Sequence, residues 1–223
     1  MKRNGILLLL AILLFAMFAF HCSKKSSTGP EPSKNTTKTI AVNGKANVFA
    51  AGRSVLPPPA NALAGEFPPV LNLASVTHRP ITFSSITGGV SGRSGVAATG
   101  PDGYADGSGT DVTPIQGISG IRHGVKVLFL VGVFLNGEEP ADPAPPAIDF
   151  TDAEHLPDIR PQLKQVFFIG DGRTETGSGE TQKFYIPDGA TRLFLGFADG
   201  YNFQGAPSFY DDNSGELSVT VNL

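Results

Sequence analysis

The sequence predicts an all-β domain: a two-sheet antiparallel β-sandwich, jelly-roll-like, with long irregular loops. Three observations predict this fold class. The 27 Gly and 18 Pro are spread between short apolar runs. No segment keeps the i, i+3, i+4, i+7 spacing of an amphipathic helix. Several runs alternate between apolar and polar residues, as half-buried strands do.

The expected strands are runs rich in β-branched and aromatic residues between Gly- and Pro-containing segments. They are 39–42, 46–50, 80–86, 125–134, 165–169, 182–186, 192–197 and 216–221. Segment 216–221 alternates, with its leucine and valines on one face, which predicts a strand with one wet side. Segment 125–134 is almost continuously apolar, which favours a central strand covered on both faces by two packed sheets. The alternative, a buried helix, is disfavoured by its β-branched and aromatic content and by Gly132.

Long irregular loops are expected at 53–69, 90–120 and 136–161. Loops longer than about 15 residues are usually either functional or disordered. The middle loop is rich in Gly and acidic residues over 100–111, so it is a candidate ligand loop, with a solvated mobile loop as the alternative. The Pro-rich stretch 140–146 is more simply a stiff connector.

The chain begins with the pattern of an exported protein. Lys2 and Arg3 precede an apolar run over 6–20 that has no charged residue, which is the arrangement of a secretory signal peptide. The run is shorter than the about 20 residues that a spanning helix needs, so cleavage is expected rather than a permanent span. Residues 1–21 are therefore interpreted as a signal peptide.

Cys22 is the single cysteine and follows this run directly, where a bacterial lipoprotein carries its lipid-modified cysteine. Phe20 and His21 are bulkier than the usual residues there, so a spectator cysteine behind an ordinary signal peptide is the alternative.

Residues 22–38 contain no aromatic residue and no Ala, Val, Leu, Ile or Met, which predicts a flexible tether. Residues 39–223 then form one domain. The expected location is the cell envelope, with a lipid anchor in the membrane at the outer surface or in the periplasm.

The charge balance of the expected domain excludes one class of partner. Residues 39–223 carry 11 Lys and Arg against 19 Asp and Glu, a net charge of −8. An acidic surface repels phosphate backbones. Nucleic acid is therefore not an expected partner.

The sequence lacks the common catalytic motifs. It has no Gly-x-Ser-x-Gly elbow, phosphate loop, His-Glu-x-x-His or paired cysteine motif. His78, His123 and His155 lie in different segments, with no ligand spacing between them. We therefore expect that the protein is not an enzyme. A hydrolase whose site is assembled only in space stays an alternative; it would need a histidine beside a nucleophile or a carboxylate, and three isolated histidines would argue against it.

Oxygen-bearing side chains gather near the C-terminus. Asp199 follows an expected strand, and Asp212 and Asn213 lie in an acidic turn before the last strand. Carboxylate and amide oxygens are ligands that calcium prefers. Asp212 and Asn213 are adjacent, so both can face one cation only if the backbone leaves strand geometry, which Gly215 makes easier. On this chemistry alone, an ordinary hairpin turn is the simpler interpretation.

A longer pattern surrounds these residues. It consists of Ile186-Pro187-x-Gly189-Ala190, a leucine-rich strand, Asp199, and Tyr210-x-Asp212-Asn213-Ser214-Gly215 before an alternating strand, with upstream blocks at 167–172 and 81–88. This pattern resembles the PA-I galactophilic lectin family, small β-sandwich lectins that bind galactose through calcium. The likeness covers 81–223 discontinuously and is strongest from Phe167 onward.

The resemblance implies a calcium site. Asp199, Asp212 and Asn213 would be ligands through their side chains, and the carbonyl of Phe209 would be a further ligand. Another backbone ligand would come from near Gly92. Two vicinal sugar hydroxyls would complete the coordination, and the carboxylates would accept charge-assisted hydrogen bonds from them.

The resemblance also implies a sugar-contacting loop. Pro114-Ile115-Gln116-Gly117 lines up with it, which would make Gln116 a sugar contact. Thr113 stands where the family has a histidine, so the sugar is left open, with a galactose-like one among the candidates. The segment 200–208 is longer than its counterpart in the family, so it would either extend the sugar site or cover it.

These observations lead to a functional hypothesis: a cell-surface, calcium-dependent, lectin-like protein that binds a glycan or polysaccharide. The alternative is a structural or adhesive surface domain with a stabilising calcium or no ligand. Tyr201, Phe203 and Tyr210 are candidates to stack on a sugar face, although aromatic residues in this fold more often fill the core or the base of a loop.

Overall fold

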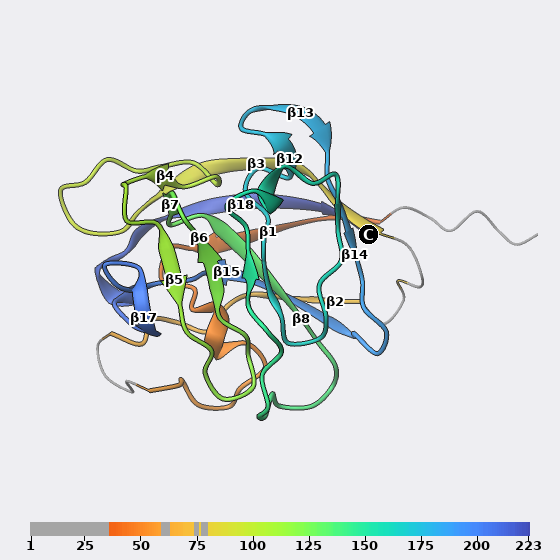
Figure 1. The fold of residues 1–223 in the computed structure, drawn as a ribbon. Coiled ribbons are helices and arrows are strands. Elements are labelled where there is room, and N and C mark those ends of the chain that lie inside the picture. Colours follow the sequence, from red (N-terminus) through yellow and green to blue (C-terminus); the bar gives the residue numbers. More distant parts are fainter. Residues whose placement is uncertain (1–35, 59–62, 74–75, 77–79) are drawn as a thin grey trace, which may run out of the picture. The chain divides into compact units, whose positions relative to one another are not determined.

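The computed structural model describes residues 36–58, 63–73, 76 and 80–223. Within these residues the chain forms strands and three short 3₁₀ helices, and no α-helix. The expected all-β class is confirmed, with several antiparallel sheets as in a β-sandwich (Figure 1). The jelly-roll order stays a prediction. The expected signal peptide, Cys22 and His78 lie outside the described residues.

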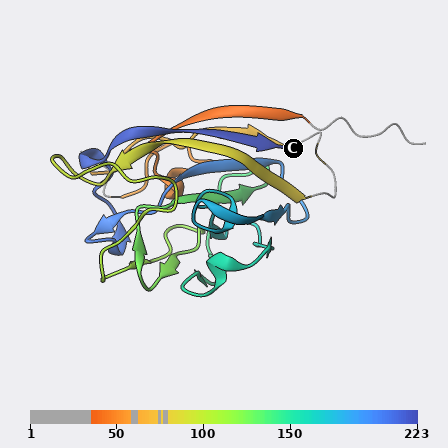
Figure 2. The same ribbon diagram turned by 90° about the horizontal axis from the view of Figure 1, so that it is seen from above.

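The first sheet has five strands in the order β1-β18-β3-β14-β10. They are β1 (Thr37–Asn43), β18 (Ser214–Asn222), β3 (Pro80–Ser91), β14 (Lys183–Tyr185) and β10 (Asp158–Ile159). Figure 2 shows β1, β18 and β3 as one layer lying over the rest of the domain. Thr37 and Lys38 were expected in the tether, but they belong to β1 because their backbone pairs with the end of β18.

The second sheet has four antiparallel strands in the order β11-β8-β15-β2. They are β11 (Val166–Phe168), β8 (Leu130–Leu135), β15 (Arg192–Phe197) and β2 (Val70–Asn72). All six residues of β8 are buried. Side chains from this sheet and from the first sheet belong to one hydrophobic core, which is the packing that a sandwich requires.

The remaining strands form one further sheet and two pairs. The sheet has the order β16 (Gly200–Tyr201), β17 (Gln204–Pro207), β5 (Thr110–Val112), β6 (Ile121–His123) and β9 (Ile148–Asp149). The pairs are β12 (Arg173–Glu175) with β13 (Ser178–Thr181), the protruding hairpin of Figure 1, and β4 (Tyr104–Ala105) with β7 (Lys126–Val127). The loops expected at 90–120 and 136–161 therefore contain short strands.

Three 3₁₀ helices connect strands in the described residues: η1 (Val48–Ala50), η2 (Ala153–His155) and η3 (Tyr210–Asp212). The strand expected at 46–50 is therefore wrong. Asn47 explains the helix, because its buried side chain accepts a hydrogen bond from the Phe49 amide (2.9 Å) and donates one to the Ala64 carbonyl (2.9 Å). Such a cap favours a helical turn over a strand.

The single central strand expected at 125–134 is also wrong. The chain makes β7, turns at Leu128 with a φ of 56°, and then makes β8. Val127 pairs with Tyr104 of β4, whereas Leu130 pairs with Phe197 of β15. The apolar run is continuous because two different sheets bury its two halves.

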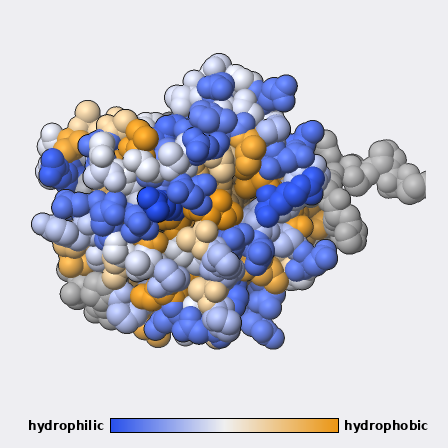
Figure 3. Space-filling view, in the orientation of Figure 1, coloured by the Kyte–Doolittle hydropathy of each residue, from blue (hydrophilic) through white to orange (hydrophobic). Residues whose placement is uncertain are grey.

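Hydrophilic and hydrophobic residues are both found on the surface of the domain (Figure 3). Figure 3 shows mainly hydrophilic residues on the face seen in Figure 1, with hydrophobic residues reaching the surface in the middle, below the protruding hairpin. None of the helices in the described residues has the length and apolar character to cross a membrane.

Candidate functional site

A pocket of about 560 Å³ lies where the end of β3, the β4 region and the C-terminal segment meet. Three of the residues expected to bind calcium line it: Asp199, Phe209 and Asp212. Gly92, which follows β3 directly, lines it as well. The fold thus brings together residues that are more than 100 positions apart in the sequence.

Asp199 is the buried carboxylate of this pocket, with 3% of its surface exposed. Its Oδ1 accepts a hydrogen bond from the Gly200 amide (2.7 Å), and its Oδ2 accepts one from Nδ2 of Asn213 (2.9 Å). No Lys, Arg or His of the described residues forms an ion pair with it. Burial raises the pKa of Asp199 to about 7, and the nearby Asp212 charge adds to the rise, because loss of hydration disfavours the charged form.

Asn213 lies beside Asp199 and is 2% exposed. Its Nδ2 also donates to the Gly44 carbonyl (3.0 Å). Its Oδ1 is buried and has no hydrogen-bond partner among the described residues. A Cβ on Gly92 would lie 3.6 Å from this oxygen, so the oxygen faces the Gly92 wall of the pocket. A buried unpartnered polar atom costs about 1–3 kcal/mol, so it calls for an explanation.

The backbone around Asp212 departs from strand geometry, which is the condition for Asp212 and Asn213 to face one cation. Asp212 is the last residue of η3, and Asn213 is its C-cap. Phe209 precedes the helix in the left-handed region, with a φ of 67°. Gly215 has a φ of 91°, and a Cβ there would lie 2.2 Å from the Gly89 carbonyl oxygen. Glycine is therefore required at the point where the turn joins β18.

Three aromatic residues were candidates to stack on a sugar, and they have different positions. Tyr210 is fully buried; its hydroxyl accepts from the Asp199 amide (3.0 Å) and donates to the Phe197 carbonyl (3.2 Å). It therefore positions Asp199 and cannot stack. Phe203 also lines the pocket, but it is half-buried and packs against the core. Tyr201 lines the pocket, is 66% exposed, and its ring centroid lies 5.5 Å from that of Phe209.

The structure does not bring Gln116 to this pocket. Gln116 lies in the turn between Ile115 and Ile118, which pair as an isolated bridge. Its carbonyl accepts a hydrogen bond from Nη2 of Arg53 (2.6 Å), and it is not among the residues that line the pocket. The expected alignment therefore fails at this position, because the chain beyond β5 turns toward the Arg53 side of the domain.

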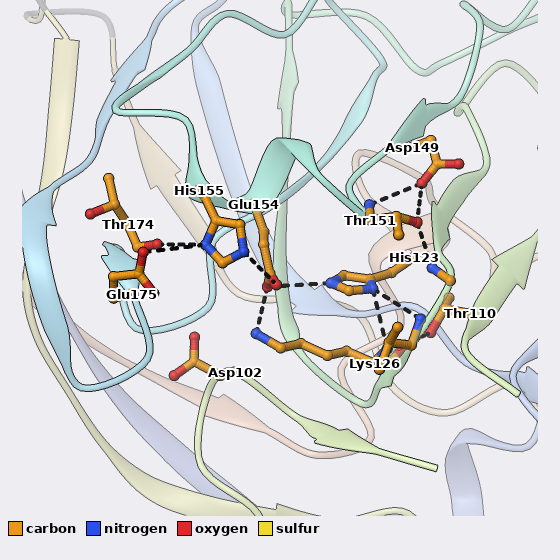
Figure 4. Close-up of polar contacts among 12 residues, drawn as sticks. Asp102, Thr110, His123, Lys126, Asp149, Thr151, Glu154, His155, Thr174 and Glu175 are labelled. Carbon is orange, nitrogen blue, oxygen red and sulfur yellow. Dashed lines mark hydrogen bonds and ion pairs between the residues drawn. The ribbon is translucent and has the colours of Figure 1, made fainter. Parts of the chain in front are cut away.

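A second polar centre surrounds Glu154, which is 8% exposed (Figure 4). Lys126 forms an ion pair with its Oε2, and Nε2 of His123 lies 3.3 Å from the same oxygen. Nε2 of His155 lies 3.4 Å from Oε1, and Nδ1 of His155 lies 2.8 Å from the Thr174 carbonyl oxygen. Burial would raise the pKa of Glu154, but the contacts from His123 and Lys126 outweigh it, and the pKa is lowered.

Sequence reasoning missed this centre. His123 and His155 come from different segments of the sequence, yet both lie beside one carboxylate, so these two histidines are not isolated. The signal was not visible because the turn after β6 and helix η2 meet only in space. Nδ1 of His123 accepts from the Val125 (3.3 Å) and Lys126 (3.2 Å) amides, so its proton belongs on Nε2. That nitrogen lies 3.3 Å from Oε2 of Glu154 but has no hydrogen-bond partner of good geometry in the described residues.

The chemistry of this centre favours a structural role. A general base needs a nitrogen that is free to take a proton and lies near the reacting group. Nδ1 of His123 is already used by the backbone, and the ring packs 5.5 Å from Phe129. In the described part of the chain, the contacts of the two imidazoles are carboxylates, backbone groups and aromatic rings. A nucleophile is not among them.

Metal binding by acidic and basic side chains alone is not indicated. Over the described ranges, no three His, Cys, Asp or Glu are grouped to hold a metal ion. Three carboxylates line the pocket at Asp199, namely Asp106, Asp199 and Asp212, but they are not grouped closely enough to hold an ion by themselves, so a cation there would also need amide and carbonyl oxygens. Calcium accepts such mixed oxygen ligands, whereas zinc favours nitrogen and sulfur.

Comparisons with models of protein families, with curated proteins and with solved structures gave no match for this chain. The functional assignment therefore rests on the chemistry of the Asp199 pocket.

Proposed function

We propose that this protein binds carbohydrate in a calcium-dependent manner, and that the Asp199 pocket is the site. One observation carries the proposal. Asp199 is buried without a cationic partner in the described residues, and Oδ1 of its neighbour Asn213 is buried without any partner there. A cation accepted by both groups would relieve both costs at once.

The donor set fits calcium. Asp199 and Asp212, which line the pocket, would supply carboxylates, and the unpartnered Oδ1 of Asn213 beside it would supply an amide oxygen. Phe209 and Gly92 also line the pocket and would supply backbone carbonyls. Calcium takes six to eight oxygens and tolerates water among them. When bound, it would neutralise the two carboxylates and offer its remaining positions to hydroxyl oxygens.

The pocket also suits a sugar. Its volume of about 560 Å³ is within the range of small-molecule sites. The exposed ring of Tyr201 at its rim presents an apolar face of the kind that packs against the C–H face of a hexose. Carboxylates beside the ion would accept charge-assisted hydrogen bonds from vicinal hydroxyls.

A calcium titration followed by thermal unfolding tests the ion site. At a hundredfold excess over Kd, a bound ion stabilises by about 2.7 kcal/mol, which raises Tm by roughly 5–10 °C for a domain of this size. Asp212→Ala should abolish this rise. Asp212 is exposed at the end of η3, so the variant should still fold.

Asp211→Ala is the matched control, because Asp211 is a carboxylate of the same helix that does not line the pocket. It should keep the full calcium response. No rise in Tm for the unmodified protein at saturating calcium would refute the ion site.

A glycan array with and without a chelator tests the sugar. Retention that the chelator removes supports the proposal. Calcium stabilisation without any retained glycan would favour the structural or adhesive alternative.

Export and lipid anchoring belong to the same proposal. Extracellular calcium is abundant enough to fill a weak site with several water ligands. Mass spectrometry of the mature N-terminus tests the anchor: diacylated Cys22 supports it, and an unmodified N-terminus elsewhere contradicts it.

A further inference from the structure

Arg93 is the one cationic side chain among the residues that line the pocket, which otherwise include the carboxylates Asp106, Asp199 and Asp212. In the described part of the chain, no carboxylate lies within ion-pair distance of its guanidinium. Its side chain nevertheless lines the same cavity as these carboxylates.

Hydrogen bonds from Ser91 and Val96 fix the backbone of the turn that carries Arg93. Ser91 is buried, and its hydroxyl contacts the carbonyl oxygens of Arg93 and Val96, both at 2.8 Å. The Val96 amide donates to the Arg93 carbonyl (3.3 Å). The backbone of Arg93 is thus fixed at the pocket wall next to Gly92, while its side chain stays exposed.

The ion would neutralise Asp199 and Asp212. Asp106 keeps its charge, but its Oδ1 is held by the Ser108 amide (2.8 Å), the Ser108 hydroxyl (2.8 Å) and the Gly109 amide (3.1 Å), and it forms no ion pair with Arg93. The ion and the guanidinium of Arg93 would then be two separate cationic groups lining one cavity. An anionic group on the ligand would interact favourably with both, and the guanidinium fork matches a carboxylate through two parallel hydrogen bonds.

We propose that the ligand of this pocket is an acidic glycan, with a hexuronate residue whose hydroxyls bind the calcium and whose carboxylate binds Arg93. This inference rests on the proposed function and specifies its substrate class. It also reconciles an acidic domain with an acidic ligand, because the local charge at the pocket, not the net charge, determines the contact.

Calorimetric titrations at a fixed free calcium concentration test the inference. The probes are galactose against galacturonate, glucose against glucuronate, and galactose 6-sulfate. The uronate of at least one pair should bind at least tenfold more tightly than its neutral partner. Galactose 6-sulfate distinguishes carboxylate recognition from simple attraction of any anion: it should gain less than the uronate does.

Variants of Arg93 identify the contact. Arg93→Gln should remove the uronate preference, so that the uronate and its neutral partner bind with equal affinity. Arg93→Lys should restore part of the preference, because lysine keeps the charge but loses the fork. Arg122→Gln is the matched control: Arg122 is an exposed arginine of β6, paired with Asp149 at 3.4 Å and absent from the pocket lining.

The outcomes distinguish a failure of uronate recognition from a failure of calcium binding. Calcium stabilisation with equal affinity for a neutral sugar and its uronate would overturn the inference and leave the proposed function standing. A uronate preference that survives Arg93→Gln would also overturn it. The absence of any calcium response would remove the proposed function and the inference together.

Discussion

Asp199 and Glu154 are both buried carboxylates of one domain, yet their surroundings differ in charge. Glu154 has Lys126, His123 and His155 around it, and its pKa is lowered. Asp199 has only neutral hydrogen-bond donors, and its pKa is raised to about 7. The charge of Glu154 is balanced by neighbouring cationic groups within the described chain, although Nε2 of His123 beside it is buried without a hydrogen-bond partner there. Asp199 forms no ion pair with a cationic side chain of the described residues, and this difference is the reason for proposing a cation site at Asp199.

The largest expected effect is the loss of stability when Glu154 is removed. Glu154→Ala removes the carboxylate and leaves Lys126 and buried His123 without their partner, so it should lower the free energy of unfolding by about 3–5 kcal/mol. Chemical denaturation at neutral pH measures this. Glu175→Ala is the control, since Glu175 is exposed and touches His155 only at 3.9 Å; it should cost less than about 1 kcal/mol. Equal effects of the two variants would show that Glu154 has no special role.

The next largest effect is the pH dependence of stability that buried Asp199 produces. A carboxyl pKa that is raised in the folded state means that the folded protein binds the proton more tightly than the unfolded one. In the absence of calcium, stability should therefore decrease as pH rises from about 4, the ordinary pKa of Asp, to about 7, the pKa of buried Asp199. The loss amounts to at most roughly 4 kcal/mol, at about 1.4 kcal/mol for each unit of pKa shift.

Calcium should flatten this decrease, because the ion stabilises the charged form of Asp199. Denaturation series at several pH values, with calcium and with a chelator, measure both profiles. The Asp212→Ala variant should keep the decrease and lose its response to calcium. A stability that stays level between these pH values without calcium would contradict the charge deficit at Asp199.

Glu154 gives stability a pH dependence of the opposite sign to that of Asp199. Its pKa is lowered in the folded state, so its contribution to stability is present above the unfolded pKa of about 4.5 and is lost as pH falls through the folded value. Glu154→Gln should therefore make the acid limb of the unmodified protein shallower. The same substitution should leave the decrease between about pH 4 and 7 in place, since that limb belongs to Asp199. Separate limbs would establish that the two centres act independently.

The two centres also differ in how far the sequence predicts them. Asp199, Phe209 and Asp212 come from one short segment after β15, which was expected at 192–197 and has those bounds. Their closeness along the chain is compatible with one site, but the prediction that they share an ion came from the resemblance, since the residues alone favoured an ordinary hairpin turn. The Glu154 centre joins the turn after β6 to η2, which are about 30 residues apart and paired by charge only in three dimensions.

The other sequence-based predictions that the structure does not match have similar causes. Gln116 was placed by alignment to a resemblance, and the path of the chain after β5 takes it to Arg53 instead. The segment 46–50 has strand-like composition, but the side chain of Asn47 caps a helical turn. The run 125–134 was expected as one strand because burial makes both of its halves apolar. Periodicity reports burial, whereas pairing partners and caps decide where an element begins and ends.

The smallest expected effect concerns the rim of the pocket. Tyr201→Ala should weaken sugar binding by about 0.5–1.5 kcal/mol, the range of aromatic contacts beyond their buried area, which is roughly a twofold to twelvefold loss in affinity. The calcium-induced rise in Tm should not change, because Tyr201 is exposed and supplies no carboxylate or amide oxygen. Tyr185→Ala is the matched control, since Tyr185 lies in β14 and packs under Arg160, 3.4 Å from ring centroid to guanidinium carbon. If both variants weaken sugar binding equally, the loss comes from the stability of the domain and not from stacking. A loss confined to Tyr201→Ala would show that the hairpin β16–β17 extends the site rather than covers it.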